Sequence, residues 1–305
     1  MNNMKHGLVL GLLTSVISGS IYATEGGTIG YPLGIDAIYS GVMFPKGLTG
    51  MLTYQNYSAD KVTDSHGNTP SGINSFKINS NALSARFDYT WPETKILGAD
   101  VGSRATFAFP DVDVKNEVNY VGDVGGSSKG MTDSTITPMM LGWHGKNLQQ
   151  VAGMDITIPV GKYNKNDAVN VGSGYTTFAP YYAFTWFDRS WDFSGKLVYI
   201  INQKNTHTDY KSGNGFTLET SMGYHINPKF TAGITGYVFK QVTDDKQDGE
   251  VYEDGYRGQV MGLGPYISYR SDAGPALIIR AYKEYQAENH SKGESLFAGL
   301  MYHFK

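Results

Sequence analysis

The sequence predicts an all-β chain that folds as an antiparallel transmembrane β-barrel of about twelve strands, of the kind found in bacterial outer membranes. Two observations predict it. Segments that alternate apolar and polar residues are joined in turn by very short and by distinctly longer connections. The residues before them have the three-part pattern of a secretory signal peptide. A secreted β-sandwich or lipocalin-like barrel would also alternate, but it has no reason to sort its loops by length.

The first 23 residues predict a cleaved signal peptide. Lys5 precedes an uncharged apolar run from Gly7 to Gly19, and mainly small or polar residues follow as far as Ala23. The run is shorter than the roughly 20 apolar residues that a spanning helix needs. We therefore expect cleavage between Ala23 and Thr24 and export to the outer membrane of a Gram-negative bacterium.

Residues 24–46 come before the first clear strand and mix Gly with Tyr and apolar residues. They could form a periplasmic tail, an additional strand or a plug folded into the lumen. A free tail has little use for apolar residues such as Ile35, Ile38 and Phe44, so the composition favours a plug. Residues 47–305 are then the barrel domain.

The connections alternate in length along the whole chain. The short ones are rich in turn residues and lie at 92–94, 144–147, 188–190, 227–228 and 271–274. The long polar ones lie at about 59–74, 111–133, 162–174, 205–213, 243–255 and 287–293. If the first strand starts in the periplasm near Gly47, every long connection lies outside the cell and every short turn faces the periplasm.

Each strand segment has one apolar parity, which suits lipid, and one polar parity, which suits the lumen. In chain order, the outward parity includes Leu83, Phe87 and Trp91; Leu97, Val101 and Phe107; Leu148, Met154 and Ile158; Trp191, Phe193 and Leu197; Phe216, Leu218 and Tyr224; Leu263, Ile267 and Tyr269; Leu277, Ile279 and Tyr285. The last segment runs Leu296, Ala298, Leu300, Tyr302 and Phe304, an alternating aromatic ending that barrel-assembly machinery recognises. The four tryptophans stand beside short turns, which predicts an aromatic girdle at the periplasmic interface.

The polar parity places charges and tyrosines in the lumen. The candidates for lining or binding are Arg86, Asp100, Arg104, Asp155, Lys196, Glu219, Arg280, Glu284, Tyr181, Tyr237, Tyr266 and Tyr282. A structural network in which the charges neutralise one another fits this parity, and so does a polar constriction that filters solutes.

No cofactor, metal or catalytic set is expected. The acidic stretch 244–250 resembles a calcium loop only faintly, because Lys246 occupies a ligand position, and the seven His have no metal-binding spacing. Ser221 and His225 share the lumen parity, but no third partner for a hydrolase is evident. The absence of Cys excludes disulfides and lipid attachment at a cysteine, and the absence of a basic run argues against nucleic-acid binding.

Four segments carry a resemblance to a known family. They are Glu25–Gly27 with Tyr31–Gly34, Tyr57–Lys61 with His66–Asn68, Gly262–Pro265, and Lys283–Asn289 with Gly293–Leu296. Together they make the chain similar to the family named for involvement in the meta-pathway of phenol degradation. The resemblance implies an outer-membrane transporter, distantly like the long-chain fatty acid and toluene channels. It implies uptake of a hydrophobic or aromatic molecule, without chemistry on a ring.

The function expected from the sequence is passive passage of small hydrophobic or aromatic molecules through a monomeric barrel. Its expected partners are outer-membrane lipid, lipopolysaccharide, the barrel-assembly machinery and the solute itself. A structural or adhesive surface barrel with a closed lumen is the alternative, and an outer-membrane hydrolase is less favoured. Neither a cofactor nor nucleic acid is an expected partner.

Overall fold

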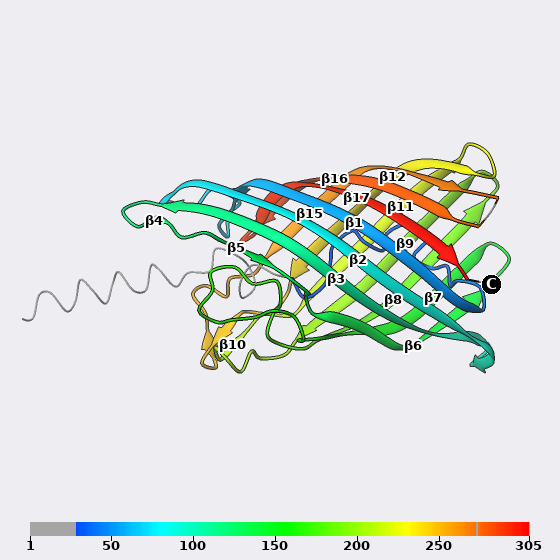
Figure 1. The fold of residues 1–305 in the computed structure, drawn as a ribbon, viewed down its shortest axis with the longest axis horizontal. Coiled ribbons are helices and arrows are strands. Elements are labelled where there is room, and N and C mark those ends of the chain that lie inside the picture. The colour runs from blue at the N-terminus through cyan, green and yellow to red at the C-terminus, as the bar shows by residue number, and fades with distance from the viewer. Residues whose placement is uncertain (1–28, 273, 305) are drawn as a thin grey trace, which may run out of the picture.

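Twelve long antiparallel strands close into a barrel, which confirms the predicted fold (Figure 1). The computed structural model describes residues 29–272 and 274–304, so the predicted signal peptide and its Ala23–Thr24 cleavage site lie outside the described residues. The barrel strands are β1 (Gly47–Val62), β2 (Ile73–Ile96), β3 (Ala99–Val118), β6 (Ser134–His144), β7 (Leu148–Ile158), β8 (Thr177–Asp188), β9 (Trp191–Asn202), β11 (Gly215–His225), β12 (Phe230–Gln241), β15 (Gln259–Arg270), β16 (Ala276–Glu288) and β17 (Ser291–His303). No helix in the described part of the chain is long and apolar enough to cross a membrane.

Each barrel strand pairs with its neighbours in the sequence, and the last strand pairs with the first. Thr49 of β1 faces His303 of β17, and Met51 of β1 faces Arg86 of β2. The pairing of β2 with β3 completes the ring. A closed ring satisfies the backbone hydrogen bonds of every barrel strand, as a strand surrounded by lipid requires.

Short turns connect the strands at one end of the barrel, at the right in Figure 1. Only Arg189 and Ser190 separate β8 from β9. The predicted turn at 92–94 is wrong: β2 continues to Ile96, and Leu97 and Gly98 make the turn with φ angles of 51° and 76°. Two consecutive positive φ angles are typical of a type I′ hairpin. Residues 91–94 instead interrupt the pairing of β2 with β3, and such an irregularity tolerates Pro92.

The opposite end of the barrel carries the long connections and extra strands. β2 and β3 have 24 and 20 residues, and β3 also pairs with β4 (Gly122–Asp123) and β5 (Gly126–Lys129). A separate small sheet contains β10 (Tyr210–Lys211), β13 (Lys246–Gln247) and β14 (Glu250–Val251). The long connections predicted at 111–133 and 243–255 therefore contain strands of their own.

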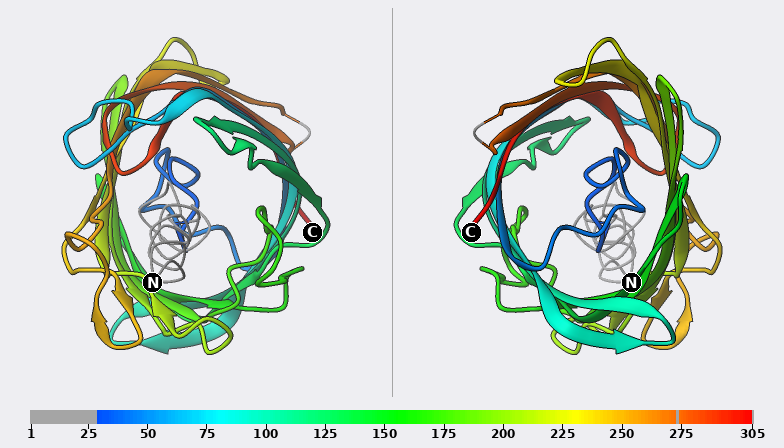
Figure 2. Two further views of the ribbon diagram at one scale, coloured as in Figure 1. Left: turned by 90° about the vertical axis from the view of Figure 1, so that its left-hand side faces the viewer. Right: turned by 90° about the vertical axis from the view of Figure 1, so that its right-hand side faces the viewer.

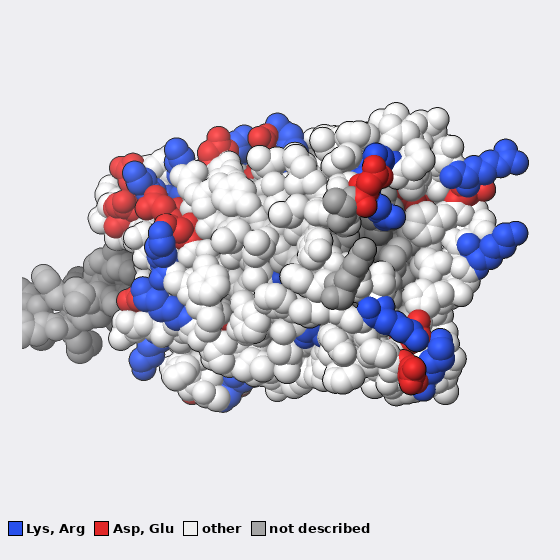
Figure 3. Space-filling view, turned by 45° about the vertical axis from the view of Figure 1, so that its right-hand side comes forward, with Lys and Arg blue, Asp and Glu red and all other residues white. Residues whose placement is uncertain are grey.

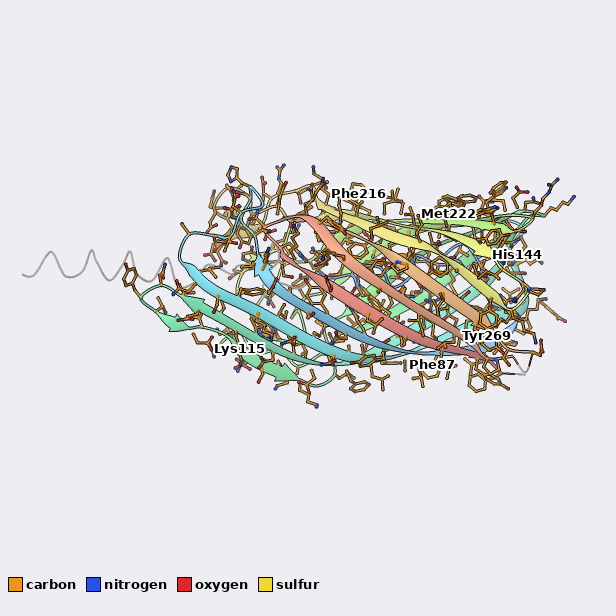
Figure 4. All side chains as sticks on the ribbon, turned by 90° about the horizontal axis from the view of Figure 1, so that it is seen from above. Phe87, Lys115, His144, Phe216, Met222 and Tyr269 are labelled. Atoms are coloured by element: carbon orange, nitrogen blue, oxygen red, sulfur yellow. The ribbon has the colours of Figure 1, made fainter. Side chains whose placement is uncertain are left out.

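The outer wall is apolar between two charged ends. On the face shown in Figure 3, most Lys, Arg, Asp and Glu side chains gather toward the two ends of the barrel. Figure 4 labels Phe87, Phe216 and Met222 along the wall, with His144 and Tyr269 near the short turns. Phe87, Leu218 and Leu300 are each more than two-fifths exposed. An apolar belt bounded by polar ends suits a bilayer.

Two residues of the predicted outward parity at the start of β3 are not exposed. Ala99 and Val101 are buried, whereas Phe107 and Phe109 are exposed as predicted. The pairing of β3 with β6 shifts register between Gly102 and Arg104. Two steps along β3 there span three along β6, from Met140 to Thr137, so the extra residue belongs to β6 and β3 keeps its alternation.

Candidate functional site: a plugged lumen

Residues 29–46 lie inside the barrel, as the end-on views of Figure 2 show for the dark blue segment. This plug, residues 29–46, starts beside the outer ends of β8 and β9, where Gly30 lies against Thr177 and Asn202. It finishes near the short turns, where the Phe44 carbonyl accepts a hydrogen bond of 2.9 Å from Thr90 Oγ1. The plug therefore follows the lumen from its outer to its inner end.

Glu219 of β11 holds the backbone at the middle of the plug. Its two carboxylate oxygens accept hydrogen bonds from the amides of Gly34, at 2.7 Å, and Asp36, at 2.9 Å. Gly34 has a φ angle of +73°, and a Cβ on it would lie 2.8 Å from the Tyr282 ring and 2.9 Å from the Tyr237 ring. Glycine is required here, because a larger residue would be strained in the backbone and would collide with both rings.

Further backbone groups of the plug bind the wall on either side of this point. Tyr282 Oη donates to the Gly34 carbonyl and Arg280 Nη2 to the Ile35 carbonyl, each at 2.9 Å. Ser221 Oγ donates to the Ala37 carbonyl at 3.1 Å, and the Gly41 amide donates to Thr185 Oγ1 at 3.0 Å. Polar groups of the wall thus satisfy the irregular backbone of the plug, as a buried segment requires.

The side chain of Asp36 meets three cations of the wall. Its Oδ1 lies 2.6 Å from Arg86 Nη1, and its Oδ2 lies 3.2 Å from Arg104 Nη1 and 2.8 Å from Lys196 Nζ. Arg86 and Arg104 also share Asp88, at 2.6 and 2.8 Å. Arg86, Arg104 and Lys196, here called the cation cluster, come from β2, β3 and β9.

Other predicted lumen residues surround these contacts inside the barrel. Asp155 lies 3.9 Å from Lys196 Nζ, and the Tyr181 ring centroid lies 4.3 Å from the same atom. Glu284 accepts hydrogen bonds from the hydroxyls of Tyr57 and Tyr237 at 2.9 and 2.8 Å. The charges therefore form the compensated network that was one of the two interpretations of the sequence.

Tyr266 and Asp100 differ from the rest of the predicted set. Tyr266 is buried beside Asp192, away from the plug's central contacts. Asp100 lies near the short turns, away from the middle of the plug, and pairs with two exposed groups, Lys95 at 2.9 Å and His144 at 3.1 Å. It pairs across the sheet with Gly142, where a Cβ would lie 2.9 Å from Met43 of the plug, so it keeps the lumen parity of Arg104.

Two cavities meet at the ion pairs of Asp36. The larger, of about 580 Å³, extends from Arg86 and Arg104 to the turn end, where Pro228 and Gly274 line it. The smaller, of about 60 Å³, extends toward the outer end and is lined by hydroxyls such as those of Thr53 and Thr106. Asp36, Arg86 and Arg104 border both cavities, so they mark the constriction of the lumen.

Ser221 and His225, which share the lumen parity, have separate partners. They are four positions apart on an extended strand, about 13 Å at 3.3 Å per residue. Ser221 binds the plug, whereas His225 Nε2 lies 2.9 Å from Asp192 Oδ2 and its Nδ1 lies 3.5 Å from Thr231 Oγ1. Within the described residues, no group of three His, Cys, Asp or Glu side chains is placed to hold a metal ion.

Asp36 is the functional residue that sequence reasoning missed. It was not on a strand, so the parity argument that selected the lumen residues did not reach it. A signal was nevertheless present, because Asp36 is the one charged residue between Glu25 and Lys46. A lone carboxylate in an apolar segment that enters a barrel needs cationic partners on the wall.

Comparisons with known proteins agree with this architecture. An outer membrane channel from Pseudomonas putida F1 superposes with a TM-score of 0.75 at 18% sequence identity, covering 90% of this chain and 100% of that one. The transport unit of the autotransporter AIDA-I from Escherichia coli gives a TM-score of 0.52 at 10% identity, covering 86% and 93%. These two likenesses show a shared outer-membrane barrel fold.

The sequence itself identifies the family. No curated protein matches the chain. A family model, however, matches residues 59–299, which is most of the barrel, and so confirms the resemblance seen in the sequence. The chain therefore belongs to the family described as "Putative MetA-pathway of phenol degradation".

Proposed function

We propose that this protein is an outer-membrane channel for passive uptake of small hydrophobic or aromatic molecules into the periplasm. The observation that carries the proposal is the cavity of about 580 Å³ between the plug and the wall. Its size falls in the range of pockets that hold small organic molecules. Met51, Met140 and Ile278 of the wall and Ile38 and Met43 of the plug line it.

The plug is the proposed gate of this channel. A ring-sized solute cannot follow the small hydroxyl-lined gap past Asp36 without a shift of the plug, because that gap has room for only a few water molecules. The plug is one continuous segment bound by discrete hydrogen bonds and ion pairs, so it can leave as a unit. Movement of the plug would join the two cavities into one path.

The proposed setting is a monomer in the outer membrane. One chain closes the ring by itself, and the exposed apolar wall gives lipid a continuous surface. We propose contact with lipopolysaccharide at the outer end, and recognition of β17 by the barrel-assembly machinery through its outward residues Leu300 and Tyr302.

Uptake by intact cells tests the proposal. An in-frame deletion of the gene should slow entry of a panel of radiolabelled aromatic and aliphatic compounds, and the intact gene should restore it. Permeabilising the outer membrane should abolish the difference, because the protein then no longer limits entry. Unchanged entry of every compound would refute transport.

A closed structural or adhesive barrel is the second candidate, favoured by the ion pairs that bridge the lumen at Asp36. Conductance of planar bilayers separates the two. A channel should show discrete opening events, whereas a closed barrel should stay silent even when residues 29–46 are loosened by substitution. An enzymatic role is not proposed, because Ser221 and His225 are engaged separately.

A further inference from the structure

The charges that face the middle of the plug balance only when Asp36 is counted. The four cations there are Arg86, Arg104, Lys196 and Arg280. The three carboxylates of the wall are Asp88, Asp155 and Glu219. Without Asp36, the site would lack one negative charge, and a buried charge without a partner is strongly unfavourable.

The negative charge that Asp36 supplies is a carboxylate, and its contacts define the chemistry of the site. Both Asp36 oxygens are used, and each lies within 3.2 Å of a guanidinium or ammonium nitrogen. Guanidinium groups match the planar geometry of a carboxylate and bind it by charge-assisted hydrogen bonds. The cation cluster is therefore a carboxylate site whose occupant in this structure belongs to the chain itself.

The larger cavity reaches this same site. Arg86, Arg104 and Asp36 border it, while Val42, Met51 and Met301 give it apolar walls. Arg280, which is 6% exposed, also borders the cavity, and its Nε has no hydrogen-bond partner among the described residues. A molecule in the cavity can thus place an apolar body against the methionines and an anionic group at the cluster.

We propose that the solute is a small monocarboxylate with an aromatic or branched apolar body, and that its carboxylate replaces Asp36 on Arg86, Arg104 and Lys196. The plug is then an internal competitor of the solute, and arrival of the correct solute opens the path. This inference rests on the proposed function, since it names the substrate class of the same site. A neutral ring lacks the charge, and a second carboxylate would overcompensate it.

Asp36 is held at the site by the plug, so only a carboxylate that binds more tightly than a simple one can displace it. A group held on a short segment competes at an effective concentration in the millimolar range. A bare carboxylate such as acetate therefore displaces Asp36 poorly. Burying a ring in the cavity strengthens binding by about ten- to hundredfold, which lets an aromatic acid compete where acetate does not.

Calorimetric titration of the purified full chain in detergent tests the inference, with benzoate, acetate and benzyl alcohol as probes. Benzoate should bind, whereas acetate and the neutral alcohol should bind at least about tenfold more weakly. Asp36→Asn removes the internal competitor, so it should tighten benzoate binding by about tenfold or more. Adding Arg86→Gln to Asp36→Asn should abolish that gain.

The matched control is Lys283→Gln, which removes an exposed cation from the outer wall and should leave benzoate affinity unchanged. A shift of electrophoretic mobility on heating establishes that each variant still forms a barrel. Weaker or equal benzoate binding by Asp36→Asn would overturn the inference, and so would benzyl alcohol binding as tightly as benzoate.

The proposed function is judged by a separate measurement. Bilayer openings together with equal binding of benzoate and benzyl alcohol would keep the channel and reject the carboxylate selectivity. Silent bilayers for wild type and for Asp36→Asn would reject the channel itself. The two failures are therefore distinguishable.

Discussion

The two sides of the lumen hold the plug in different ways. On β2 and β3, Arg86 and Arg104 bind the side chain of Asp36. On β11, at the opposite side of the ring, Glu219 binds the backbone amides of the plug, and Lys196 of the adjacent strand β9 reaches Asp36 from there. A solute can imitate a side chain but cannot easily imitate two successive backbone donors. The cation side is thus exchangeable, whereas the Glu219 side positions the segment.

The largest expected effect comes from breaking the Glu219 side. Gly34→Val should displace the plug, because the branched residue disfavours a φ of +73° and collides with two tyrosine rings. The collision and the loss of two hydrogen bonds to a carboxylate together weaken docking by roughly 4–9 kcal/mol. Bilayer recordings should show a channel that is open most of the time.

Gly72→Val is the matched control for this substitution. Gly72 also has a positive φ, of +109°, but a Cβ there would have nothing within 4 Å. It lies in the outer connection between β1 and β2. If both variants open the channel equally, loss of the plug is not the cause.

A smaller effect is expected from breaking the cation side. Asp36→Asn should weaken docking of the plug by about 2–4 kcal/mol, because the cation cluster loses a charged partner while the Glu219 contacts remain. Brief openings should become more frequent in bilayer recordings without becoming permanent. If Asp36→Asn keeps the channel open for a larger fraction of the time than Gly34→Val does, the cation cluster contributes more to docking of the plug than the Glu219 contacts do, contrary to this prediction.

A second buried carboxylate, Asp245, can be compared with Asp36, because it is held by hydrogen bonds instead of by ion pairs. Asp245, in the outer connection after β12, accepts hydrogen bonds of 2.6 Å from the Gly213 amide and from Gln241 Nε2. Burial raises its pKa from 3.8 to about 7, although these donors oppose the rise. The folded loop therefore retains a proton that the unfolded chain would release between these two values.

The stability of this loop should consequently fall as pH rises. It is greatest below the ordinary pKa of the carboxyl and is lost as pH approaches about 7. Between pH 5.5 and 7.5 we expect a loss of about 2 kcal/mol, seen as faster proteolysis around residues 242–258. Asp245→Asn should remove the pH dependence, and a rate that instead falls with pH would contradict the assignment.

The smallest effect is expected from an ion pair on the outer wall. Lys283 Nζ lies 3.0 Å from Glu294 Oε1, but both side chains are more than three-fifths exposed. Water screens such exposed pairs, so they contribute little to stability. A double-mutant cycle of Lys283→Gln and Glu294→Gln, followed by denaturant unfolding in micelles, should give a coupling energy close to zero. A coupling energy as large as the effect of Asp36→Asn on docking of the plug would show that enclosure in the lumen does not strengthen an ion pair.

The sequence predicted the wall of this barrel much better than its contents. Alternation over β9 and β11 placed Lys196 and Glu219 inside, because a lipid-facing side chain must be apolar and the opposite parity is then free to be charged. Exposure was predicted less well than parity: Ala99 and Val101 have the outward parity and are nevertheless buried. Alternation gives the side that a residue faces, but not which neighbours cover it.

The central contact of the site was beyond the reach of strand periodicity. Asp36 lies 160 residues from Lys196 in the sequence and belongs to a segment without regular structure. Only the closed ring brings β2, β3 and β9 around one carboxylate. The sequence could indicate a plug from its apolar residues, but the partners of that plug depend on three-dimensional closure.

The long-range contacts of the plug also set an order of assembly. The Gly34 carbonyl accepts a hydrogen bond from Tyr282, 248 residues later, and β1 pairs with β17, the last strand among the described residues. Residues that leave the ribosome first are therefore among the last to reach their native surroundings. A chain that ends before β16 would have neither a complete wall nor a settled N-terminal segment, so synthesis must finish before the interior can be filled.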